Sequence, residues 1–114
     1  RKTIKEDGTK VYEIWGPLFF GSVQAFNNKF DISTDPERVE IDFVESKVTD
    51  HSGIEAVKNL VERFEAAGKI VTLKHLSPQC VKLLNKANPH LNEIIVRDID
   101  DPRYHVLAAQ DENL

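Results

Sequence analysis

Four consecutive residues, Asp50-His51-Ser52-Gly53, combine a carboxylate, an imidazole and a hydroxyl group, and these could bind an anion or accept a phosphoryl group. They lie between a predicted buried strand and the most regular helical pattern in the chain. In a parallel α/β sheet this is the carboxyl end of a strand, where ligands usually bind. The helix start adds free N–H groups and the positive end of a dipole. The sequence therefore predicts a candidate anion or phosphorylation site here.

Ser52 supports two interpretations, and residue spacing leaves both open. With Glu55 three residues later, it matches a capping box, in which the serine begins the helix and needs no further role. Such a cap contributes about 1 kcal/mol. Alternatively, Ser52 accepts a phosphoryl group, which would gain from the helix dipole but would lie near Asp50 and Glu55. Like charges at that point would limit the benefit or provide a switch.

The sequence predicts neither catalysis nor a metal site. A hydrolase needs a nucleophile, a base and an orienting group in one site, and residues 50–54 lack the Gly-x-Ser-x-Gly pattern of a nucleophile elbow. A structural zinc site needs four close-set ligands, whereas the only cysteine is Cys80 and the histidines are scattered. Glycine-rich nucleotide motifs are missing too, so no cofactor is predicted. The histidines are His51, His75, His90 and His105.

The composition fits one globular domain, residues 1–114, with 40% hydrophobic and 30% charged residues. A net charge of −4 argues against binding a nucleic-acid polymer. The apolar runs are much shorter than the roughly 20 residues of a membrane helix. A single cysteine cannot form an internal disulfide, which fits a reducing compartment. Because the chain contains no methionine, we expect it to be excised from a longer protein.

Strand and helix patterns alternate along the chain after an opening hairpin. Asp7-Gly8 favours the hairpin turn, Gly16-Pro17 is expected to end the second strand, and Ser77-Pro78 is typical of a helix start. Alternation of this kind predicts right-handed crossovers. The expected fold is α/β, with a mixed sheet of four to five strands, mostly parallel after the hairpin, and three to four helices. Expected strands are Thr3–Glu6, Lys10–Trp15, Val39–Glu45, Ile70–Leu73 and Ile94–Val96; expected helices are Leu18–Lys29, Ser52–Ala67 and Pro78–Ala87.

An aromatic run between residues 19 and 30 has helical spacing and is therefore expected to lie mostly in the core. Phe19 and Phe20 are the expected exceptions. An adapter domain could present these two side chains as a docking surface for another protein.

The ordered set of motifs resembles the STAS domain, which occurs in sulfate-type anion transporters and in antagonists of anti-sigma factors. The resemblance covers about residues 9–106. It rests on five segments: Val11-Tyr12-Glu13-Ile14-Trp15-Gly16, Pro17-Leu18-Phe19-Phe20-Gly21, Ile41-Asp42-Phe43, Asp50-His51-Ser52-Gly53-Ile54, and Ala66-Ala67-Gly68-Lys69 before Ile70-Val71-Thr72-Leu73.

The resemblance implies a role for the motif Asp50-His51-Ser52-Gly53. In the antagonists this loop reads Asp-Ser-Ser-Gly, and a kinase phosphorylates the second serine. Ser52 matches that serine, Asp50 the aspartate and Gly53 the glycine, whereas His51 replaces the first serine. Nucleotide or small-anion binding has also been suggested for the family.

The Gly-Pro-Leu-Phe-Phe stretch is more similar to the transporter branch. This branch implies a regulatory domain on the cytoplasmic side of the inner membrane, with the transporter's transmembrane domain or a cytoplasmic protein as partner. The alternative is a stand-alone anti-sigma factor antagonist, switched by phosphorylation of Ser52.

Overall fold

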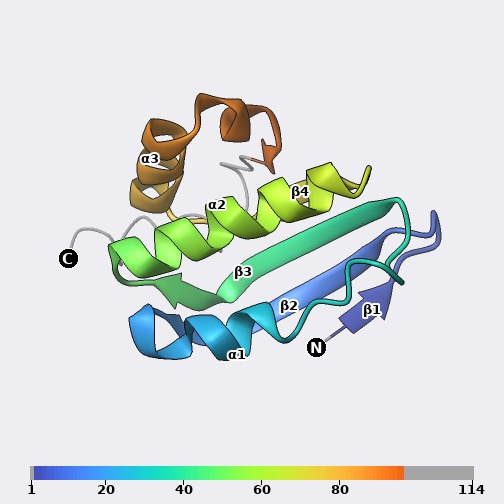
Figure 1. The fold of residues 1–114 in the computed structure, drawn as a ribbon, viewed down its shortest axis with the longest axis horizontal. Coiled ribbons are helices and arrows are strands. Elements are labelled where there is room, and N and C mark those ends of the chain that lie inside the picture. The colour runs from blue at the N-terminus through green and yellow to red at the C-terminus, as the bar shows by residue number, and fades with distance from the viewer. Residues whose placement is uncertain (1, 97–114) are drawn as a thin grey trace.

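A computed structural model describes residues 2–96 of the chain, which form one mixed sheet with helices between its strands (Figure 1). Residues 97–106 of the expected domain, with His105, and the acidic end of the chain lie outside the described residues. The strands are β1 (Lys2–Ile4), β2 (Lys10–Leu18), β3 (Arg38–Val48), β4 (Ile70–Lys74) and β5 (Ile95–Val96). The helices are α1 (Val23–Asn27), α2 (His51–Ala66) and α3 (Pro78–Ala87), with 3-10 turns η1 (Phe20–Ser22) and η2 (Pro89–Glu93).

The strands lie in chain order across the sheet, β1-β2-β3-β4-β5. β1 pairs antiparallel with β2, and every later pair is parallel. Right-handed crossovers between successive neighbours place the connecting helices on one face, and α1 and α2 cross that face in Figure 1. The predicted α/β fold, with its opening hairpin and mostly parallel sheet, is confirmed.

Helix α2 supplies the centre of the core. Its apolar stripe packs against the sheet and against helices α1 and α3. Four residues of the stripe have no exposed surface: Val57, Leu60, Val61 and Phe64. Ile41 and Phe43 of β3 meet this stripe from the sheet side. Gly68, with φ of 79°, follows the helix as its C-terminal glycine.

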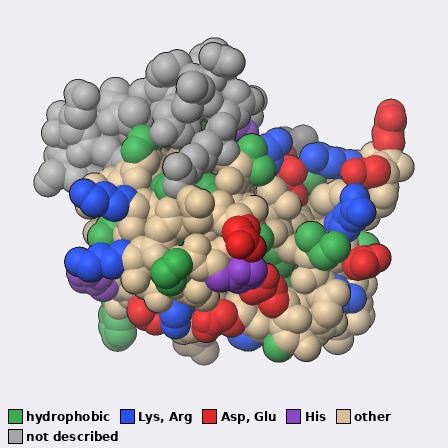
Figure 2. Space-filling model, turned by 90° about the horizontal axis from the view of Figure 1, so that it is seen from above, with side chains coloured by type: hydrophobic (Ala, Val, Ile, Leu, Met, Phe, Trp, Pro, Cys, Tyr) green, Lys and Arg blue, Asp and Glu red, His purple; other side chains and the backbone are tan. Residues whose placement is uncertain are grey.

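Among residues 2–96, no helix combines the length and apolar character that crossing a membrane requires. On the face drawn in Figure 2, acidic and basic side chains of the described residues are interspersed.

The predicted helix Leu18–Lys29 is wrong in its extent. Leu18 still belongs to β2, where it pairs with Val48, and Phe19 is extended, with φ of −152° and ψ of 179°. Only Val23–Asn27 is α-helical, after the η1 turn. Helical spacing of aromatic residues predicted a continuous helix, but pairing with β3 keeps the first part of the segment in the sheet.

The expected end of the second strand at Gly16-Pro17 is also wrong, because β2 continues through both residues. A register shift against β3 lies between Glu13 and Trp15, and Gly16 has φ of 80°. The strand thus bends at an irregular point and resumes pairing up to Leu18.

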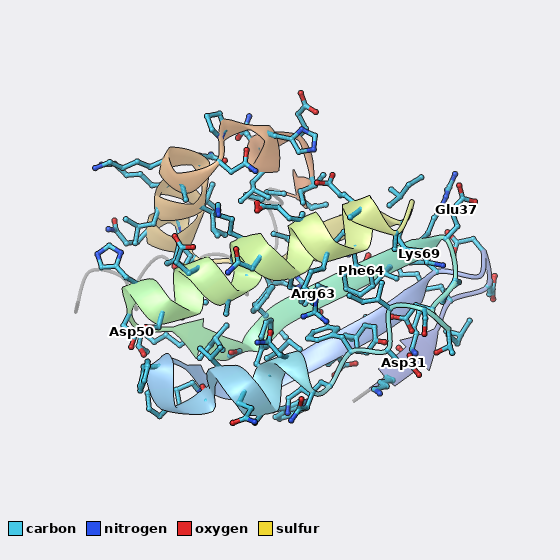
Figure 3. All side chains as sticks on the ribbon, viewed as in Figure 1. Asp31, Glu37, Asp50, Arg63, Phe64 and Lys69 are labelled. Atoms are coloured by element: carbon cyan, nitrogen blue, oxygen red, sulfur yellow. The ribbon has the colours of Figure 1, made fainter. Side chains whose placement is uncertain are left out.

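The buried carboxylate of Asp35 connects several segments at the end of the sheet where β2 and β3 begin. Asp35 is only 4% exposed; its side chain accepts hydrogen bonds from Tyr12 Oη at 2.6 Å and Lys10 Nζ at 2.6 Å. Lys69, near the end of α2 (Figure 3), donates to the Asp35 carbonyl at 2.7 Å. Burial, followed by the bond to Asp35, raises the pKa of Tyr12. Asp35 therefore ties β2, the α1–β3 connection and the α2–β4 turn together.

We predict that Asp35→Ala lowers the free energy of unfolding by about 2–4 kcal/mol, because it leaves the Lys10 ammonium and the Tyr12 hydroxyl without their shared acceptor. Urea unfolding measures the change. Asp31→Ala is the matched control: Asp31 is exposed and bonds locally to Ser33, so little change is expected. Equal losses in the two variants would contradict a special role for the buried carboxylate.

Candidate functional site at the start of helix α2

The first turn of α2 is capped by Asp50. Its Oδ1 accepts a hydrogen bond from the Gly53 N–H at 2.9 Å. The prediction that Ser52 is the N-cap is therefore wrong: the helix begins at His51, so Ser52 already lies inside the first turn. Two residues in the segment can cap a helix, and the one nearer the strand does so. Ser52 is partly buried.

The other oxygen of Asp50 binds a different segment of the chain. Oδ2 accepts from the Phe20 N–H at 3.0 Å, which joins the η1 turn to the start of α2. Figure 3 shows Asp50 at this junction. The N–H of Phe20 and then that of Gly53 hold the pKa of Asp50 below its ordinary value, because both bonds favour the charged carboxylate. One exposed side chain thus bridges two elements that are far apart in sequence.

Gly53 is required by close packing at the same junction. A Cβ atom at this position would lie 2.7 Å from the Leu18 carbonyl oxygen and 2.8 Å from Val48 Cγ1. The Leu18 oxygen is itself held by the Thr49 N–H at 3.0 Å, so it cannot easily move away. The glycine of the motif therefore has a structural role: it allows α2 to start directly against the end of β2.

Ser52 and Phe20 line the same groove, of about 800 Å³, between the η1–α1 segment and α2. Arg63 lies farther along α2 at the same groove (Figure 3). A second groove, of about 540 Å³, lies on the other side of the α2 start, against α3. The first groove also contains Gly21, Val23, Gln24, Asn27, His51, Glu55, Ala56 and Asn59; the second contains Val48, Thr49, Asp50, His51, Ile54, Gln79, Cys80 and Leu83.

Phe19 and Phe20, the predicted docking residues, are 40% and 79% exposed. Phe26 and Phe30, farther along the aromatic run, are buried in the core. The structure thus brings Phe20 together with Asp50, Ser52 and Gly53, although the sequence pattern predicted two separate sites. The hydrogen bond between Phe20 and Asp50 joins residues too far apart in the chain for any local pattern to reveal.

Two other histidines form carboxylate pairs away from Ser52. His75 Nδ1 lies 2.8 Å from Asp42 Oδ1, and His90 Nε2 lies 2.9 Å from Glu65 Oε2. His75 also has a left-handed backbone, with φ of 59°. Sequence reasoning missed both pairs, although parallel pairing of β3 with β4 places Asp42 beside Lys74, the neighbour of His75.

The first turn of α2 offers the Ser52 hydroxyl group beside backbone N–H groups. The Asp50 carboxylate is directed to backbone N–H groups. Within residues 2–96, His, Cys, Asp and Glu side chains do not gather in threes in a way that could hold a metal ion. The geometry fits contact, anion binding or modification at Ser52.

Comparison with known proteins identifies the family of this domain. The model of the STAS domain family matches residues 1–101. The chain belongs to the STAS domain family. Over 77 residues, 68% of the chain, it is 35% identical to the Bacillus subtilis protein named "Putative sulfate transporter YbaR". The aligned part is only 16% of that protein's length.

Solved structures of both branches resemble this STAS domain. A sulfate transporter family protein from Wolinella succinogenes matches with a TM-score of 0.68 and 25% identity, over 97% of this chain and 93% of that one. The STAS domain of an antisigma-factor antagonist from Rhodobacter sphaeroides matches with a TM-score of 0.59 and 30% identity. That match covers 64% of this chain and 80% of the other.

We predict that Gly53→Ala destabilises the domain by about 1–3 kcal/mol, because the added methyl group overpacks against the Leu18 carbonyl. Helix propensity alone predicts the opposite sign, a gain of up to about 1 kcal/mol. Urea unfolding decides between them. Asn59→Ala, at an exposed position of the same helix, is the control and should leave stability unchanged or slightly higher. A gain for Gly53→Ala would show that the junction is loosely packed.

We predict that the amides of Phe20 and Gly53 titrate together with a midpoint below the ordinary aspartate value of 3.8. A lowered pKa in the folded state means that the Asp50 contribution to stability is present above the unfolded-state pKa. It is lost as the pH falls through the folded-state pKa. NMR shifts of the two amides measure the midpoint. Two separate midpoints would mean that no single carboxylate holds both groups.

Proposed function

We propose that this STAS domain is the non-catalytic regulatory part of a SulP-type anion transporter, on the cytoplasmic side of the membrane. The observation that carries the proposal is the 35% identity to the Bacillus subtilis protein named "Putative sulfate transporter YbaR". The resemblance to the Wolinella succinogenes protein over almost the whole chain supports the same branch. The transporter's transmembrane domain, or a cytoplasmic protein, is the partner in this proposal.

The contact surface in this proposal is the exposed aromatic pair Phe19 and Phe20. Single exposed apolar side chains are common on protein surfaces, but adjacent ones beside a groove favour a docking role. A docked domain shifts a transporter between conformations only if it binds one of them better, and about 1–3 kcal/mol of difference is enough. The domain therefore needs no chemistry of its own to alter transport.

Ser52 is the proposed point of control. Its position in the first turn of α2 and at the groove with Phe20 allows a phosphoryl group or a small anion to act beside the docking surface. A nucleotide is a further candidate ligand for the groove. Charge at this point changes the surface that the partner meets.

The alternative is an anti-sigma factor antagonist, which the 30% identity to the Rhodobacter sphaeroides domain favours. An antagonist would bind an anti-sigma factor and lose that affinity when Ser52 is phosphorylated. Hydrophobic segments long enough to cross a membrane, encoded in the same reading frame as this domain, would favour the transporter. A reading frame that encodes this domain alone would decide for the antagonist.

We predict that removing residues 1–114 from the full-length transporter changes anion uptake, abundance or oligomeric state, because the domain biases its conformations. Phe20→Ser should reproduce part of the uptake defect at equal surface expression, since it removes an exposed apolar contact without disturbing the core. Ala25→Ser, an exposed position of α1 outside the groove, is the control. Unchanged uptake, abundance and assembly after the deletion would rule the regulatory function out.

A further inference from the structure

The imidazole ring of His90 lies between two carboxylates that come from different elements. Its Nε2 lies 2.9 Å from Glu65 Oε2, near the end of α2, and its Nδ1 lies 3.3 Å from Glu93 Oε2, in η2. A neutral imidazole carries a single N–H, so one of its nitrogens would turn a lone pair toward a carboxylate oxygen. Only the imidazolium offers an N–H to both sides. The arrangement therefore fits the charged ring.

We propose that His90 is a pH-sensitive latch: the protonated ring holds η2 against α2, and loss of one ring proton to the solvent releases η2 and weakens the attachment of β5. The neutral ring keeps one N–H and can hold only one of the two carboxylates. When that one is Glu93, which belongs to η2 itself, nothing in the latch ties η2 to α2. This proposal goes beyond the proposed function and does not rest on it.

The position of η2 affects β5 because the two elements follow one another directly. Ile94 lies between them; its N–H donates to the Leu91 carbonyl at 3.1 Å, and its carbonyl accepts from the Leu73 N–H of β4 at 2.9 Å. β5 is only two residues long and borders the sheet among residues 2–96. Leu91 has no exposed surface, so η2 stays anchored in the core when the latch opens. The predicted release is therefore a local loosening at one border of the sheet.

The charges around the ring set the pH range of the latch. The bond to Glu65, and then the charges of Glu65 and Glu93, raise the pKa of His90 above its ordinary value of 6.5. Helix α3 also packs against η2 and carries Lys82 and Lys86; a positive charge near the ring lowers its pKa, so the net rise means that the carboxylates prevail. A raised folded-state pKa means that the latch stabilises the fold below the unfolded-state pKa. This contribution is lost as the pH rises through the folded-state pKa, in the range above 6.5.

The experiment follows the His90 ring nitrogens and the Leu73 amide of the 114-residue chain by NMR as the pH is raised. We expect the ring to titrate with a midpoint above 6.5. The protection factor of the Leu73 amide, which corrects for the faster intrinsic exchange at high pH, should fall about two- to fivefold through the same midpoint, as expected for the loss of one exposed ion pair. A midpoint at or below 6.5, or unchanged protection of Leu73, would overturn the proposal.

His90→Gln and Glu65→Gln separate the latch from a general effect of pH on the fold. His90→Gln cannot titrate, so the protection of Leu73 should no longer change with pH in the range where the ring of the unmodified chain loses its proton. Glu65→Gln keeps the shape of the side chain and removes its charge, so the midpoint of His90 should fall toward 6.5. A pH response of Leu73 that persists in His90→Gln would overturn the proposal.

Glu62→Gln is the matched control for the loss of one negative charge from α2. Glu62 lies on the same helix but pairs with Lys58, at 3.5 Å. We expect this variant to leave both the His90 midpoint and the protection of Leu73 unchanged. Equal falls of the midpoint in Glu62→Gln and Glu65→Gln would mean that the total charge of the helix, and not the contact with Glu65, acts on the ring, and would overturn the latch. The measurements need no transporter, so their failure leaves the proposed function standing, and the reverse also holds.

Discussion

The close approach of α2 to the end of β2 is the constraint on which the rest of the site depends. At Gly53 the helix backbone contacts the Leu18 carbonyl so closely that no side chain fits between them. This contact fixes where α2 begins, and with it which residue caps the helix. It also brings the η1 turn within reach of the Asp50 carboxylate. The groove that contains Ser52 and Phe20 follows from these two contacts.

Two carboxylates act at opposite ends of α2 in different ways. Asp35 is buried and shared by a lysine and a tyrosine, so its loss would leave polar groups unsatisfied inside the protein. Asp50 is exposed and binds only backbone N–H groups in the described contacts, so water can replace it at modest cost. The end of α2 near Asp35 is therefore suited to holding the fold together. The second is suited to change, and it is the end that carries the candidate site.

The sequence predicted the features that local residues determine. Ser77 caps α3, with Pro78 at its first position, as expected, because serine and proline are strong and unopposed signals there. At α2 two possible caps lie two residues apart, and the choice of Asp50 over Ser52 accompanies contacts with Leu18 and Phe20 that no local pattern contains. The aromatic run predicted too long a helix for a similar reason: pairing of Leu18 with Val48 outweighs helical spacing. The site could be placed at the end of a strand, but its connection to Phe20 could not.

The irregular end of β2 also affects how the domain behaves at high local concentration. Among residues 2–96, β1 pairs only with Lys10–Tyr12 of β2, so the remainder of this strand borders the sheet. An exposed strand edge bearing an aromatic residue such as Trp15 is a template for sheets of neighbouring molecules to add to. The register shift after Glu13, the left-handed Gly16 and the missing N–H of Pro17 each interrupt that template. The bend that made this strand hard to predict thus protects the domain against edge-to-edge aggregation.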